Sequence, residues 1–275
     1  MRVSTNIQSM VAQRYVQNHT EEQAQQDSQL SSGERIVRAS DDPAGLAISE
    51  RMKSLLRSNS QAERNTNDSV SLLQVAEGSL STMQTITTRL RELSMQSASD
   101  TVSDMDRAII DKEFQQMKAE VSRLTASTSF NGNNIIKDKG SVYDLQIGVN
   151  NDKNFDRIRY DMGKIMDSSN NFGIAGINIR SKESSQQSLG ALDKMMTEIS
   201  NSRAALGSMS NRMNSVIQTL QVTRENLASS NSKIRDADIA KESANRAKNQ
   251  IAQSASLSML KMSNDGPGVI LKLLG

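Results

Sequence analysis

One stretch of about 55 residues, which starts at Pro43 and contains no further proline, constrains this chain more than any other feature. Only Gly45 and Gly78 interrupt a composition that favours helix. Its apolar residues recur at gaps of three and four, the spacing of one helical face; they are Leu72, Leu73, Ala76, Leu80, Met83, Ile86, Leu90 and Leu93. Such a helix would be on the order of 80 Å long, which no compact globule needs.

The rest of the chain predicts more helix and one β-hairpin. A helix opens near Ser103 and stops at the turn residues 130–134. Residues 142–149 alternate apolar and polar, and residues 155–162 partly repeat this, which predicts a hairpin and the only plausible β region. The helical stripe returns over residues 187–227 at heptad-compatible spacing. The predicted fold class is mainly α: a long antiparallel helical bundle or coiled coil with a small β-hairpin region.

The two ends differ from the middle because they carry few large apolar side chains. Residues 236–275 show an Ala-rich stripe and then a Leu-rich tail, and residues 1–42 are still poorer in apolar side chains. We predict that both ends are disordered in the free monomer and fold only against each other and against neighbouring copies. The residues assigned to this self-assembly are Ile7, Met10, Val11, Leu30, Ile36, Ile251, Ala255, Met259, Leu271, Leu273 and Leu274.

Charge and composition exclude several classes of partner. The formal net charge is +2, with 33 basic and 31 acidic residues well mixed along the chain, so no nucleic acid partner is expected. No window approaches about 18 consecutive apolar residues, and the start of the chain has no apolar stretch of about 7–15 residues. Neither membrane insertion nor a general secretory signal is therefore expected. The absence of cysteine excludes disulfides and thiolate metal sites.

The titratable residues form no recognisable catalytic or metal-binding motif. His19, the single histidine, lies in a polar stretch and is predicted to be a solvated helix residue. The acidic clusters at residues 41–42 and 100–106 lie where helices begin, a position that favours carboxylates through capping and the helix dipole. No phosphate-binding glycine loop, nucleophile elbow or zinc helix is present. We expect no enzyme activity, no catalytic residue, no metal and no cofactor.

Short ordered motifs towards both ends give the chain a specific signature. The first part contains LSSGERI at residues 30–36, ASDDPAGLAI at 39–48, RNTND at 64–68, AEGSL at 76–80, RLRELSMQS at 89–97 and SFNG at 129–132. The second part contains RAALG at residues 203–207, NRMNS at 211–215, NL at 226–227, SKIRDAD at 232–238 and LKLL at 271–274. In these motifs, and over nearly its whole length, the chain resembles the bacterial flagellins.

The resemblance implies an extracellular structural subunit that polymerises into the flagellar filament for motility. In that family, subunits are exported unfolded through the flagellar type III apparatus and fold on assembly. Paired terminal helices form an inner coiled-coil tube, and longer helices with a hairpin form the next shell. The domains implied are residues 1–42 and 236–275 for the two parts of the inner coiled-coil domain. Residues 43–178, with the hairpin, and the helix within 179–235 would form the outer core domain.

The resemblance also implies partners. They are further copies of the chain, the flagellar cap and junction proteins, an export chaperone at the C-terminal segment, and the flagellin-sensing toll-like receptor of animals. Arg89, Leu93 and Glu113 occupy the positions of the receptor-contact motif, although Ser94 and Met95 replace its commoner small aliphatic pair. The variable outer domains of many flagellins would interrupt a region that is short here, so the chain resembles a core-only form.

Two alternatives remain at this stage. The related hook–filament junction protein shares similar ends but would form a short ring rather than a bulk polymer. A helical ligand for a receptor or chaperone would have no polymer role at all.

Overall fold

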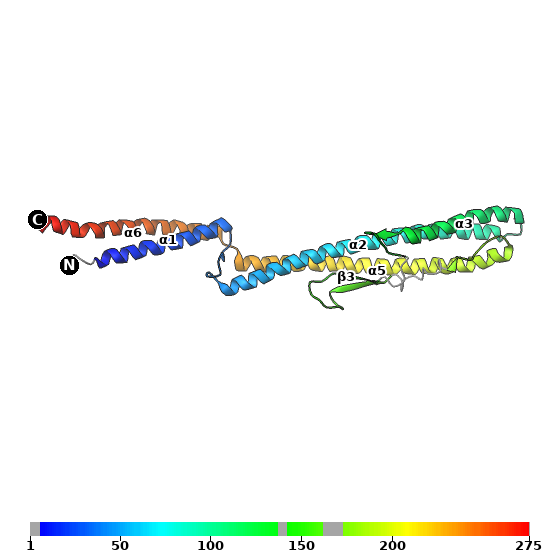
Figure 1. The fold of residues 1–275 in the computed structure, drawn as a ribbon, viewed down its shortest axis with the longest axis horizontal. Helices are drawn as coiled ribbons and strands as arrows, with labels where there is room; N and C mark the ends of the chain where they lie inside the picture. The colour runs from blue at the N-terminus through cyan, green and yellow to red at the C-terminus, as the bar shows by residue number, and fades with distance from the viewer. Residues whose placement is uncertain (1–5, 137–141, 162–172, 275) are drawn as a thin grey trace. The chain divides into compact units, whose positions relative to one another are not determined.

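Helices dominate the computed structural model, which describes residues 6–136, 142–161 and 173–274 (Figure 1). The side chains are described as far as residue 265. The predicted fold class is confirmed: the chain is mainly α, with two small antiparallel sheets. In order along the chain, its elements are α1 (Ile7–Ser32), α2 (Pro43–Ser97), α3 (Asp104–Ser127), β1 (Ser129–Phe130), β2 (Asn133–Asn134), β3 (Val142–Gln146), β4 (Arg157–Asp161), α5 (Lys182–Arg235) and α6 (Ile239–Leu274).

The chain forms two compact units. We call Met1–Leu56 with Glu225–Gly275 the terminal unit and Arg57–Arg224 the middle unit. The division therefore falls inside α2 and α5, whereas the sequence places domain boundaries after residues 42 and 235. One reason lies in the first turns of α2, which contact the last turns of α5 within the terminal unit. Ser49, for example, donates from Oγ to Asn231 Oδ1 at 2.9 Å.

Helices α1 and α6 lie side by side in the terminal unit (Figure 1). Near one end of the pair, Asn6 Nδ2 donates to the backbone oxygen of Ser263 at 2.7 Å. Towards the other end, Arg246 Nε lies 2.6 Å from Asp27 Oδ1. These contacts join the start of α1 to the later part of α6, so the two helices run antiparallel. Disorder of the ends in a free monomer stays a prediction.

A short loop connects α1 to α2 within the terminal unit. Helix α1 ends at Gly33, whose φ of 70° is the left-handed conformation that glycine adopts at low cost. Arg35 N then donates to the backbone oxygen of Arg235 at 2.6 Å. At the start of α2, Asp42 Oδ1 accepts from Gly45 N at 2.9 Å, which is the cap that the sequence predicts.

The middle unit has a hydrophobic core of its own. Helices α2, α3 and α5 and the strands supply it, and the apolar stripes read from the sequence provide most of its side chains. Leu80, Phe114 and Leu192 are fully buried there. The core also includes Leu72, Leu73, Ala76, Met83, Leu90, Leu93, Val121, Ile158, Tyr160, Met195, Ile199, Leu206 and Met213. This unit therefore buries its stripes within one chain.

Strands β3 and β4 form the predicted hairpin, with Val142 opposite Asp161 and Gln146 opposite Arg157. The expectation that this is the only β region is wrong, because β1 and β2 form a second two-stranded sheet. Asn131 and Gly132 connect these strands with φ of 49° and 80°. Positive φ at both central residues is the geometry of a type I′ turn, for which Asn-Gly is the strongest sequence signal. The sequence predicted the turn but not its two short strands.

Candidate self-assembly surfaces

Helices α1 and α6 leave a row of large apolar side chains uncovered. Ile251 on α6 is 72% exposed and Ile7 on α1 is 66% exposed. Other exposed members of the row are Met10, Val11, Tyr15, Met259 and Met262. Full burial of one such side chain contributes roughly 1.5–3 kcal/mol relative to exposure. A single copy of the chain therefore leaves much of the available stabilisation unused.

An open groove runs between the two helices and is lined mainly by apolar groups. Its volume is about 690 Å³. The lining residues are Ile7, Gln8, Val11, Ala12, Tyr15, Ala255, Ser256, Met259, Met262 and Ser263. None of the described residues that line it carries a charged side chain. The groove thus suits another apolar helix face better than a polar or charged ligand.

Most of the predicted self-assembly residues lie on this surface. Ile7, Met10, Val11, Ile251, Ala255 and Met259 are exposed, and Leu30 is half-buried. Ile36 differs: it is 1% exposed, and its Cδ1 packs close to Gly45 at the start of α2. The loop after α1 turns this side chain inward in the single chain, and its role in self-assembly stays a prediction. The side chains of Leu271, Leu273 and Leu274 lie outside the described part of the chain.

Sequence reasoning missed two members of the exposed row. Tyr15 follows Val11 by four residues, and Met262 follows Met259 by three, so both share a helical face with a predicted residue. Leu257 is also exposed, but its spacing from Ile251 and Met259 places it on another face of α6. The helical spacing was sufficient to find Tyr15 and Met262.

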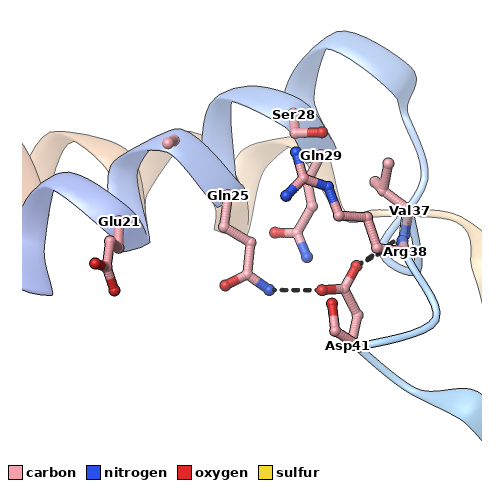
Figure 2. Close-up of a pocket in the computed structure, with 9 residues that line it drawn as sticks. Glu21, Gln25, Ser28, Gln29, Val37, Arg38 and Asp41 are labelled. Atoms are coloured by element: carbon pink, nitrogen blue, oxygen red, sulfur yellow. Dashed lines mark hydrogen bonds between the residues drawn. The ribbon is translucent and has the colours of Figure 1, made fainter.

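A small pocket between α1 and the following loop holds polar contacts rather than an apolar surface (Figure 2). Asp41 organises it: its Oδ2 accepts from Val37 N at 3.1 Å and from Arg38 N at 2.9 Å. Gln25 Nε2 on α1 donates to the other oxygen, Oδ1, at 3.3 Å (Figure 2). Asp41 therefore fixes the loop against α1, while its neighbour caps α2.

An ion-pair network joins this loop to the start of α2 and the end of α5. Arg235 Nε lies 2.9 Å from Glu34 Oε2, and its Nη1 contacts the carboxylate of Glu50. Lys53 Nζ lies 3.1 Å from Glu34 Oε1. Desolvation opposes ionisation of Glu34, but hydrogen bonds from Lys53 and Arg235 outweigh it and hold the pKa of Glu34 below its ordinary value. The charged form of Glu34 thus stabilises the folded terminal unit.

The residues of the predicted receptor motif lie in the middle unit, and only two of them are accessible. Arg89 Nη2 lies 2.9 Å from Glu113 Oε1, and Arg89 Nη1 lies 3.1 Å from Glu92 Oε2. Leu93 is 2% exposed, and its role as a receptor contact stays a prediction. It belongs to the stripe of α2 that packs into the core. Arg89 and Glu113 therefore form an exposed pair over a buried leucine.

Within residues 6–136, 142–161 and 173–274, no group of three or more His, Asp or Glu side chains could hold a metal ion. Among the helices of that same part of the chain, none combines the length and apolar character needed to cross a membrane.

Comparison with known proteins gives matches at both ends and over the full length. The bacterial flagellin N-terminal helical region matches residues 3–141, and the bacterial flagellin C-terminal helical region matches residues 189–274. A flagellin of Halalkalibacterium halodurans is 36% identical over 274 residues, which cover 100% of each chain. The flagellar filament 30.7 kDa core protein of Treponema maltophilum is 35% identical over 289 residues, again with 100% of each chain covered. The crystal structure of Bacillus cereus flagellin has 26% identity and a TM-score of 0.48 over 57% of this chain and 88% of that one.

Proposed function

The chain belongs to the bacterial flagellin family, and from this premise we propose that it is a structural subunit that polymerises into the extracellular flagellar filament for motility. The observation that carries the proposal is the exposed apolar row along α1 and α6. The terminal unit offers little of its own to cover that row, so further copies are its natural partner. A structural role needs no enzyme activity and no cofactor.

Assembly follows from burial of the row between copies. When the patch on one copy meets a different patch on the next, the contact does not close on itself and generates a helical fibre. In this arrangement residues 1–42 and 236–275 form an inner coiled-coil domain. Residues 43–178 and 179–235 form an outer core domain. The antiparallel pairing of α1 and α6 supports this division.

Export in an unfolded state and folding on assembly complete the proposal. The cysteine-free composition supports passage of an extended chain, since no disulfide can form before assembly. The flagellar cap and junction proteins would meet the chain at the growing fibre, and an export chaperone would cover the C-terminal segment before that. The exposed Arg89–Glu113 pair supports recognition by the flagellin-sensing toll-like receptor of animals.

The test replaces one side chain in the row. Ile251→Asp places a charge where the fibre would bury an apolar group, which costs far more than it does at a free surface. We expect loss of sedimentable fibres at concentrations where the unaltered chain forms them. The matched control, Ile251→Met, keeps an apolar side chain of similar size and should polymerise normally.

Electron microscopy of the same samples separates the alternatives. Long fibres from the unaltered chain fit a filament subunit, and short rings fit the hook–filament junction protein. Retained receptor or chaperone binding without any polymer would fit a helical ligand instead. Normal fibres from Ile251→Asp would contradict the role of the exposed row.

A further inference from the structure

The loop of the β3–β4 hairpin presents a single large apolar side chain to solvent. Phe155 is 81% exposed, although the chain has only four phenylalanines. The loop that carries it is tightly braced. Asp152 Oδ1 accepts from the backbone N of Asn154 at 2.7 Å and of Phe155 at 3.3 Å. Asp156, which is buried, accepts from the backbone N of Asp152 at 3.0 Å. Phe155 is therefore held outward by a structured loop.

A basic groove lies beside this loop, between the hairpin and α5. Its volume is about 760 Å³, and its charged lining residues are Lys153, Arg157, Arg159, Arg212 and Asp144. Arg159 pairs with Asp144 at 3.3 Å. Within the described part of the chain, Arg157 donates to neutral acceptors, the side-chain oxygens of Gln146 and Asn151. Among the described residues, Lys153, Arg157 and Arg212 have no ion-pair partner, so the groove keeps uncompensated positive charge.

The opposite combination occurs at the start of α3. Met105 is 80% exposed and Ile109 is 62% exposed, and their spacing of four places them on one helical face. Two carboxylates accompany them. Asp104 pairs with Arg107 at 2.8 Å. Asp106 accepts from Ser103 Oγ at 2.7 Å and has no ion-pair partner within the described part of the chain. This patch is apolar with a negative rim, whereas the hairpin patch is apolar with a positive rim.

The two patches of one copy lie too far apart to meet. Asn65 Nδ2 of α2 donates to the backbone oxygen of Gln146 at 3.4 Å, which fixes the position of the hairpin along α2. Arg107 Nε donates to the backbone oxygen of Ser97 at 2.8 Å, which fixes the start of α3 at the end of α2. Asn65 and Ser97 are about 48 Å apart along the helix at 1.5 Å per residue. Only a second copy can bring the patches together.

We propose that the hairpin patch of one copy, with Phe155, Lys153 and Arg157, docks on the α3 patch of the next copy, with Met105, Ile109 and Asp106. Opposite charges set the orientation of this contact, and the apolar side chains are buried at its centre. The contact is heterologous, so it repeats from copy to copy and builds a line of subunits. This inference rests on the proposed function, because it names one of the contacts within the polymer.

The test uses the absence of native cysteine. Equal amounts of Phe155→Cys and Ile109→Cys chains are co-polymerised and oxidised, and the products are separated under non-reducing conditions. We expect a covalent dimer as the main product, at least about 5-fold above the control that pairs Phe155→Cys with Val75→Cys, another exposed position of the middle unit. Because the chain has no native cysteine, every disulfide joins two introduced residues, and the heterodimer between the two variants is the product that reports the proposed contact.

A charge exchange covers the case in which the cysteine variants fail to polymerise. Lys153→Glu should reduce the rate of fibre elongation about 10-fold, and a second change in the same chain, Asp106→Lys, should restore it. Asp68→Lys reverses an exposed charge on α2 and should not restore it.

Each outcome has a distinct meaning. Fibres of the unaltered chain with cross-linking no stronger than in the control would overturn this contact and leave the proposed function intact. Equal restoration of elongation by Asp106→Lys and by Asp68→Lys would also overturn this contact. No fibres from the unaltered chain would instead contradict the proposed function.

Discussion

The terminal and middle units both consist mainly of amphipathic helices with aliphatic and Met side chains. They differ in whether the apolar faces of these helices are buried. In the middle unit, Leu80, Met83 and Leu192 are fully buried by neighbours in the same chain. In the terminal unit, Ile7, Ile251 and Met259 lie exposed on a pair of helices. The difference shows that a helical stripe by itself does not define a core. The number of elements packed around the stripe decides whether it stabilises one chain or joins several.

Removal of residues 236–275 is the change from which we expect the largest difference between the two units. It deletes α6 and half of the exposed row, so polymerisation should be lost completely. The middle unit keeps its own core and should still unfold cooperatively when heated, as followed by circular dichroism. Fibres from the truncated chain would show that the terminal pair is dispensable. Loss of cooperative unfolding would show that the middle unit depends on it.

Truncation of single side chains sharpens the comparison. Leu80→Ala opens a cavity in the packed core and should lower the free energy of unfolding of the monomer by about 2–5 kcal/mol. Ile251→Ala shortens a side chain that is 72% exposed and should change the free energy of unfolding of the monomer by less than about 0.5 kcal/mol. Urea unfolding of both variants checks this, provided that the free energy of unfolding depends on urea concentration with the same slope in each. Similar losses in the two variants would mean that the terminal unit is already packed in the monomer.

Amide hydrogen exchange tests the same difference without any mutation. If the ends fold only on assembly, residues 7–32 exchange at least about 100-fold faster in the monomer than the buried part of α2. Such a ratio corresponds to about 2.7 kcal/mol of opening free energy. In the fibre, the two regions should become similarly protected. Strong protection of residues 5–35 in the monomer would overturn the prediction of disordered ends.

The sequence predicted the long elements well because their signals are local and repeated. Gaps of three and four identify the face of a helix wherever it lies, and Asn131-Gly132 identifies a turn. The short strands β1 and β2 were missed because two residues are too few to show alternation. The hairpin of β3 and β4 was found because each strand is long enough to alternate.

The candidate surfaces were less predictable, since exposure depends on contacts distant in sequence. Ile36 was predicted as a self-assembly residue from the composition of the ends, and Leu93 as a receptor contact from the resemblance, yet the fold buries both side chains in the single chain. Conversely, nothing local marks Phe155 as exposed, because its outward position follows from how Asp152 and Asp156 brace the loop. Periodicity gives the face of a helix but does not tell which faces remain uncovered.

Acidification tests the ion-pair network that fixes the terminal unit, and we expect its effect to be the smallest. The folded pKa of Glu34 is lowered, so its contribution is fully present above its unfolded pKa, near 4.5, and is lost as the pH falls through the folded value. Fibres should therefore dissociate at a lower temperature at acidic pH, and Glu34→Gln should reduce this dependence. We expect the terminal unit to lose less than about 1 kcal/mol of stability on acidification, since the network is partly exposed. Light scattering during heating at pH 6 and near pH 4 measures it. Glu21→Gln on α1, where no ion pair forms among the described residues, should leave the pH dependence unchanged; an equal effect of both variants would rule out the network as its source.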